Sequence, residues 1–124
     1  MCHLIEQAKN NVLDHEKITV EYTDRIYKSD KFDVSLCKCK DCGQVFIYCF
    51  KEYNTANFED YYWSFWVPAS ESDVESLKKA DILMKFMGEL IAQKSHICWA
   101  DDGKVYWKEG GLPTPLAYAI FLPF

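Results

Sequence analysis

Three of the six cysteines lie within six residues, in the run Cys37-Lys38-Cys39-Lys40-Asp41-Cys42-Gly43. Strand-like apolar segments flank this run, so the sequence predicts a hairpin with the cysteines at its tip. Residues two apart in a strand face the same way, which places Cys37 and Cys39 on one side. Cys39 and Cys42 on a tight turn can offer two sulfur atoms to one ion, and Gly43 eases the turn. The spacing therefore predicts a cysteine-knuckle hairpin at residues 37–43 that binds a metal ion.

Structural zinc is held by four protein ligands, so a fourth ligand is expected from another segment. The candidates are Cys98 or His96 on a later predicted strand, Cys49, and Cys2-His3 at the start of the chain. We favour the later strand, because structural zinc commonly ties distant segments together, and we expect Cys49 to be a buried small hydrophobe. Reduced structural thiols, and dithiol redox chemistry or a disulfide, are the alternatives. The predicted structural Zn²⁺ site comprises Cys37, Cys39, Cys42 and Cys98.

The hydrophobic periodicity predicts a single α+β domain over residues 1–124. The predicted order is α-β-β-β-β-α-β-β, a mostly antiparallel sheet with an N-terminal helix and one long amphipathic helix. Ser72-x-x-Glu75 has the pattern of a capping box at the start of the long helix, and Asp102-Gly103 suits the turn of the last hairpin. The apolar tail, residues 112–124, is expected to pack on the domain or on a partner. The helices are expected at 3–14 and 72–93, and the strands at 18–27, 32–37, 44–53, 61–67, 96–100 and 104–108.

The acidic charge is concentrated in one stretch. Residues 51–75 contain six acids and one base, which equals the whole net charge of −5. Arg25 is the only arginine, so a nucleic-acid partner is not expected, whereas a basic protein partner is. The first residues lack the pattern of a signal peptide, and the longest apolar run, residues 116–122, is too short to cross a membrane. We therefore expect a cytoplasmic protein with reduced cysteines and no membrane partner.

No catalytic pattern stands out. The three histidines are scattered, and the chain has neither a glycine-rich phosphate loop nor a nucleophile elbow. Residues 58–66 instead contain six aromatic rings and two acids. Such rings usually fill a core, but aromatic residues beside acids are also typical of a surface that recognises a basic protein. We predict a binding protein, not an enzyme, with partner-binding residues Glu52, Glu59, Asp60, Tyr61, Tyr62 and Trp63.

The motif Cys37-x-Cys39-x-x-Cys42-Gly43-Gln44-x-Phe46 precedes acids, aromatics, Val67-Pro68 and a capped helix. This arrangement resembles small bacterial orphan proteins with a cysteine-knuckle hairpin, some of which are similar to immunity proteins of contact-dependent or polymorphic toxin systems. The resemblance implies a cytoplasmic protein that occupies the active site of a toxin domain, often a basic nuclease. We expect the chain to be a monomer or small homo-oligomer. Two alternatives are a zinc-ribbon-like regulatory module that contacts nucleic acid and a thiol oxidoreductase that uses Cys39 and Cys42.

Overall fold

The computed structural model describes residues 2–54, 60–99 and 103–110. Its helices are α1 (His3–Lys9), the short 3₁₀ helix η1 (His15–Lys17), α2 (Glu71–Lys79) and α3 (Leu83–Gln93). Its strands are β1 (Val20–Lys28), β2 (Phe32–Cys39), β3 (Val45–Asn54), β4 (Asp60–Pro68), β5 (His96–Trp99) and β6 (Val105–Lys108). None of the helices in these ranges is long and apolar enough to cross a membrane.

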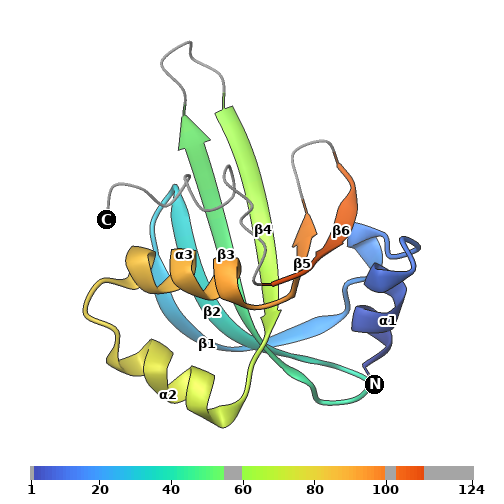
Figure 1. The fold of residues 1–124 in the computed structure, drawn as a ribbon, viewed down its shortest axis with the longest axis horizontal. Helices are drawn as coiled ribbons and strands as arrows, with labels where there is room; N and C mark the ends of the chain where they lie inside the picture. Colours follow the sequence, from blue (N-terminus) through green and yellow to red (C-terminus); the bar gives the residue numbers. More distant parts are fainter. Residues whose placement is uncertain (1, 55–59, 100–102, 111–124) are drawn as a thin grey trace.

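The six strands form one antiparallel sheet in which each strand pairs with its neighbour in sequence, in the order β1-β2-β3-β4-β5-β6. The chain leaves the sheet between β4 and β5 to form α2 and α3, which lie together on one side of it (Figure 1). The other helix, α1, packs beside β6. The predicted α+β fold with a mostly antiparallel sheet is therefore confirmed.

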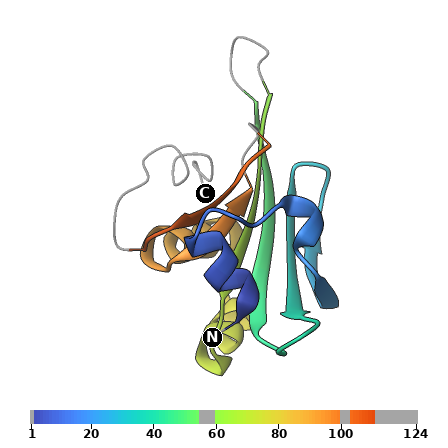
Figure 2. The ribbon, with the colours of Figure 1, turned by 90° about the vertical axis from the view of Figure 1, so that its right-hand side faces the viewer.

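Each face of the sheet carries its own apolar core. On the face that α2 and α3 cover, the strand register aligns Val34, Cys49, Phe65 and Cys98 in one row across four strands. On the face that α1 partly covers, Cys37, Phe46 and Trp66 pack with residues of α1. Side chains alternate between the faces along each strand, so both faces need apolar residues at successive positions. We call these two sides the α2/α3 face and the α1 face. Figure 2, turned by 90°, shows α1 in front with α2 and α3 behind it.

The single long helix predicted for residues 72–93 is wrong: α2 ends at Lys79 and α3 begins at Leu83. Leu77 of α2 and Leu90 of α3 both face the core, yet in one straight helix of 3.6 residues per turn they would point about 140° apart. The break turns both apolar stripes toward the sheet. The start of α2 also differs, because its capping box is formed by Ser70 and Asp73 and not by Ser72 and Glu75.

The N-terminal helix is shorter than predicted. It ends at Lys9, and Asn11 has a left-handed backbone with φ of 58°. Asparagine tolerates this conformation better than most residues, so the pair Asn10-Asn11 ends the helix. The stop lets the chain turn toward η1 and β1 while Leu4, Ile5 and Ala8 stay buried on the α1 face.

Candidate metal centre and open sheet face

Three cysteines from two distant segments of the chain meet at one corner of the domain. The sulfur atoms of Cys2, Cys39 and Cys42 all lie within 4.8 Å of one another, and this group, the thiol corner, can hold a metal ion. Cys2 and Cys39 are buried, whereas Cys42 is exposed. A metal bound here would therefore be reached from the side of Cys42. The start of α1 lies beside the β2–β3 turn (Figure 1).

The β2–β3 turn positions two of these sulfur atoms. Cys39 ends β2, and its N–H donates to the Gln44 carbonyl at 2.9 Å, while the Gly43 N–H donates to the Cys39 carbonyl at 2.9 Å. Gly43 has a φ of +78°, which a residue with a side chain rarely adopts. The Cys39-x-x-Cys42-Gly43 segment thus folds as the predicted tight turn.

The third sulfur atom comes from the residue that precedes α1. The Cys2 carbonyl accepts a hydrogen bond from Glu6 at 3.1 Å, so Cys2 belongs to the first turn of the helix. Burial of Leu4, Ile5 and Ala8 holds α1 against the sheet and brings Cys2 to the hairpin tip. The sequence showed Cys2-His3 only as one of several candidate ligand positions, because nothing local to residues 1–9 indicates where the helix docks.

The other predicted zinc ligands, Cys37 and Cys98, lie outside the two groups of described residues that can hold a metal. Cys37 shares a face with Cys39, but two residues of strand separate them by about 6.6 Å, and Cys37 is buried opposite Tyr22 and Phe46. Cys98 packs into the core of the opposite face, as Cys49 does. The sheet itself therefore separates Cys98 from the thiol corner.

His96, the alternative to Cys98 as the fourth ligand, also lies away from the thiol corner. His96 is buried and its ring packs edge-on against Phe65, with ring centres 5.5 Å apart. Its Nδ1 atom lies 2.9 Å from the Lys94 carbonyl oxygen. Burial lowers the pKa of His96, so the neutral form is favoured in this apolar site. His96 is a packed core residue.

The thiols of the corner differ in acidity. Burial, together with a hydrogen bond from its thiol to Cys42, raises the pKa of Cys2 to about 12. A hydrogen bond from the Gln44 backbone and the one from Cys2 instead lower the pKa of Cys42. Away from the corner, burial raises the pKa of Cys37 to about 12. Cys42 is thus better prepared than Cys2 to act as a thiolate ligand or nucleophile.

A second group that can hold a metal adjoins the thiol corner and shares Cys39 with it. The group consists of His3, Cys39 and Asp41. His3 Nδ1 lies 3.9 Å from Cys39 Sγ, and His3 Nε2 lies 3.3 Å from Asp41 Oδ2. One imidazole therefore bridges a cysteine and a carboxylate.

The residues predicted to bind a partner are divided between the faces. Glu52 and Tyr62 pair across β3 and β4 on the α1 face, where the Tyr62 ring stacks on Phe50 at 6.3 Å. Trp63 instead points into the α2/α3 core and is 8% exposed, so it packs the fold. Glu59 and the side chains of Asp60 and Tyr61 lie outside the described residues.

The part of the α1 face away from α1 is lined by rings around a hollow of about 470 Å³. Tyr22 packs edge-on against Tyr48 at 5.4 Å, and Tyr48 shares a hydrogen bond of 3.2 Å with Ser64. Burial raises the pKa of Tyr48 to about 12, which keeps its hydroxyl protonated. Beside these rings, Asp33 Oδ1 is buried and makes no hydrogen bond within the described structure. We call this surface the open face; it comprises Tyr22, Arg25, Asp33, Ser35, Tyr48, Phe50, Glu52 and Tyr62.

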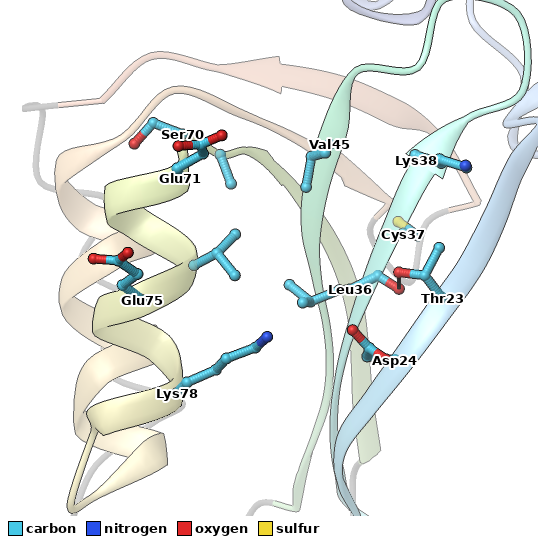
Figure 3. Close-up of a pocket in the computed structure, with 12 residues that line it drawn as sticks. Thr23, Asp24, Leu36, Cys37, Lys38, Val45, Ser70, Glu71, Glu75 and Lys78 are labelled. Atoms are coloured by element: carbon cyan, nitrogen blue, oxygen red, sulfur yellow. Dashed lines mark hydrogen bonds between the residues drawn. The ribbon is translucent and has the colours of Figure 1, made fainter.

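A groove of similar size lies between α2 and the β1–β2 pair (Figure 3). Leu36, Val45 and Val74 give it an apolar lining. Charges of both signs surround that lining, so the groove favours neither an acidic nor a basic ligand. These charged residues are Asp24, Lys38, Glu71, Glu75 and Lys78.

Comparison of the chain with models of known protein families, with curated proteins and with solved structures finds no match. The resemblance to immunity proteins therefore stays a prediction. Any function must be inferred from the arrangement of the side chains described above.

Proposed function

We propose that this chain is a non-enzymatic domain that binds a basic protein through its open face, as an immunity protein does when it covers the active site of a toxin nuclease. The single observation that carries this proposal is the ring-lined hollow with a buried carboxylate oxygen that lacks a hydrogen bond. A zinc ion at the thiol corner would stabilise the fold at the other end of the same sheet face.

The aromatic residues supply the anchor of the proposed interface. Tyr22 and Tyr62 are exposed, while Tyr48 and Phe50 are half-buried behind them. Tyrosine is enriched where interfaces gain most of their binding energy, because its ring buries a large area and its hydroxyl forms hydrogen bonds. A rigid sheet holds these rings in place before binding, which lowers the entropic cost of association.

The charge of the site favours a basic partner. A buried carboxylate oxygen without a donor is costly, and Asp33 also lines the hollow, so an arginine or lysine of the partner that enters the hollow would offset the charge of this carboxylate. Glu52 lies on the same face, and the chain as a whole carries a net charge of −5. Long-range attraction would therefore speed the encounter with a basic protein.

The test is to express the chain together with the product of the adjacent open reading frame and to purify the complex. We expect a stable complex with a basic protein and a Kd in the nanomolar range, as is typical of tight interfaces of standard size. Tyr22→Ala and Asp33→Asn should each weaken binding by about tenfold or more.

Tyr27→Ala is the matched control, because Tyr22 and Tyr27 are both exposed tyrosines of β1, at 55% and 47%. Tyr27 pairs with Val34, on the α2/α3 side of the strand, and packs against Phe32. Its substitution should leave the Kd within about twofold of the wild-type value if the open face carries the binding. Equal weakening by Tyr22→Ala and Tyr27→Ala would contradict the proposal.

One observation favours a second candidate, a thiol oxidoreductase. Cys42 is exposed, has a lowered pKa and lies beside the thiols of Cys2 and Cys39. Such a thiolate can attack a disulfide, and a neighbouring thiol can then resolve the mixed disulfide. Repeated reduction of a disulfide substrate by the metal-free protein in the presence of dithiothreitol, abolished by Cys42→Ser, would support this candidate over the first.

A further inference from the structure

We propose that His3 is the fourth ligand of a Cys₃His zinc site with Cys2, Cys39 and Cys42, and that Asp41 orients its imidazole. This inference deepens the zinc part of the proposed function. It replaces the distant fourth ligand expected from the sequence with a residue adjacent to Cys2. It also joins the two groups that share Cys39 into one coordination site.

The hydrogen positions on His3 follow from its contacts. Asp41 is a carboxylate, which accepts hydrogen bonds, so His3 Nε2 at 3.3 Å from Asp41 Oδ2 carries the hydrogen. In the neutral ring the other nitrogen, Nδ1, then has a free lone pair. This is the atom that faces Cys39 Sγ at 3.9 Å. The nitrogen available to a metal is therefore the one directed at the cysteines.

The sulfur–sulfur distances and the His3–Cys39 distance approach those of a tetrahedral zinc site. His3 lies outside the 4.8 Å group of the three sulfur atoms, so its ring must move toward Cys2 and Cys42 when the metal binds. Bonds of about 2.3 Å to sulfur and about 2.0 Å to nitrogen place sulfur ligands about 3.8 Å apart and a sulfur–nitrogen pair about 3.5 Å apart. The Nδ1–Sγ distance of 3.9 Å is within 0.4 Å of the second value. The three sulfur atoms, within 4.8 Å of one another, need to approach by about 1 Å at most. Small side-chain rotations supply such a movement, particularly at the exposed Cys42.

Asp41 supplies the outer contact that zinc-bound histidines commonly have. A carboxylate that accepts from the second ring nitrogen fixes the tautomer and increases the basicity of the ligating nitrogen. Asp41 lies inside the Cys39-x-x-Cys42 turn, so the same turn provides two ligands and the group that orients a third. Cys2 and His3 are consecutive at the start of α1 and provide the other two. The site thus links only two segments, the first turn of α1 and the β2–β3 turn.

The link has a consequence for α1. A helix of seven residues is too short to be stable alone and depends on its contacts with the rest of the fold. Two zinc ligands in its first turn would fix its orientation on the sheet. We therefore expect removal of zinc to loosen residues 2–9 before the rest of the domain unfolds.

The first experiment measures metal content and X-ray absorption at the zinc edge of the purified full-length protein. We expect one zinc per chain with three sulfur neighbours at about 2.3 Å and one nitrogen neighbour at about 2.0–2.1 Å. Four sulfur neighbours would overturn the assignment of His3 while leaving a zinc site in place. A protein that takes up no zinc would overturn the zinc site as a whole, although partner binding at the open face would still be tested separately.

The second experiment measures zinc affinity by competition with a chelator. Asp41→Asn should weaken binding by about 10- to 100-fold, as for other outer contacts of zinc ligands, and His3→Ala should weaken it further. His3→Cys should restore tight binding, because a fourth thiolate can replace the imidazole. The matched control is His15→Ala, which removes an exposed histidine that stacks on Trp99. Unchanged affinity in His3→Ala would overturn the inference.

Discussion

The two faces of the sheet are built differently, although the same strands form both. The α2/α3 face is covered by two helices and holds a continuous apolar core in which Cys49 and Cys98 are small packing residues. The α1 face is covered by one helix of seven residues, has the thiol corner at one end and leaves the open face exposed at the other. Hydrophobic burial suffices for the first face, whereas the second combines a smaller core with polar and sulfur-containing sites.

This difference assigns stability and function to opposite sides of one sheet. A closed core tolerates few changes, because each side chain touches many others. A partly covered face can present rings and charges to a partner without exposing the main core. Variants on the two faces should therefore separate loss of stability from loss of zinc or partner binding.

The largest effect is expected at the centre of the α2/α3 face. Phe65 is fully buried in the row that joins Val34, Cys49 and Cys98, and Phe65→Ala would leave a cavity there. We expect the free energy of unfolding to fall by about 3–5 kcal/mol, as measured by urea denaturation. The loss should be the same with and without zinc. A loss of less than about 1 kcal/mol would mean that this face is not the main core.

The α1 face should instead respond to zinc. With free zinc at about 100 times its Kd, the wild-type protein should gain about 2.7 kcal/mol in its free energy of unfolding. Cys2→Ser should lose most of this gain, because one of the three thiols of the corner is removed. Cys98→Ala is the control: it should lower stability through lost core packing but keep the zinc-dependent gain. If Cys98→Ala lost the zinc-dependent gain in the free energy of unfolding, Cys98 would be a zinc ligand, as the sequence predicted.

The sequence predicted the strands better than the site. Strand positions follow from short-range alternation and from turn residues such as Gly43, and the pairing of consecutive strands follows from the short connections. The predicted Asp102-Gly103 turn lies at the edge of a segment, residues 100–102, outside the described residues. The break between α2 and α3 was missed because Val74 and Leu77, and again Leu83 and Met87, each have helical spacing, and the two stripes were taken for one. The opposed directions of Leu77 and Leu90 were the available signal.

The ligands were harder to predict because both faces of the central strands are apolar. Alternation then shows that Cys37 and Cys39 share a face, but it does not show which face Cys98 occupies. The Cys39-x-x-Cys42 turn is local and was predictable. The position of Cys2 next to this turn depends on how α1 packs on the sheet. That packing is a tertiary contact, which no local pattern in the sequence indicates. Trp63 was ambiguous for the same reason, since six rings in residues 58–66 gave no sign of which were buried.

A smaller effect is expected where α2 begins. Ser70 Oγ accepts a hydrogen bond from the Asp73 N–H at 3.2 Å, and the Asp73 carboxylate accepts one from the Ser70 N–H at 2.9 Å. Ser70→Ala should lower the free energy of unfolding by about 1 kcal/mol in urea denaturation, because it removes the cap. Ser72→Ala, at the position that the sequence suggested, should change it by less than about 0.5 kcal/mol. A larger loss of stability in Ser72→Ala than in Ser70→Ala would contradict the observed cap.

The smallest expected effect is a pH dependence of the stability that the Ser70–Asp73 cap contributes. Burial alone would raise the pKa of Asp73, but hydrogen bonds from Ser70 and the contact with Lys94 outweigh it and lower this pKa. The stabilisation that ionised Asp73 contributes is therefore complete above its pKa in the unfolded chain, about 3.9. It is lost as the pH falls through the lower pKa of Asp73 in the folded protein. At neutral pH, Asp73→Asn should cost less than about 1 kcal/mol, because the pair lies near the surface. Denaturation at decreasing pH should show the difference from wild type shrink, and a difference that grows would contradict this sign.

The nearest-neighbour order of the strands affects how the chain can assemble during translation. Each strand pairs with the strand made just before it, and Cys2, His3, Cys39, Asp41 and Cys42 all precede β3 in the chain. The β1–β2–β3 segment and the proposed zinc site can therefore form while α2 and α3 are still inside the ribosome. The large core of the other face must wait for those helices, so metal uptake would precede the final folding step.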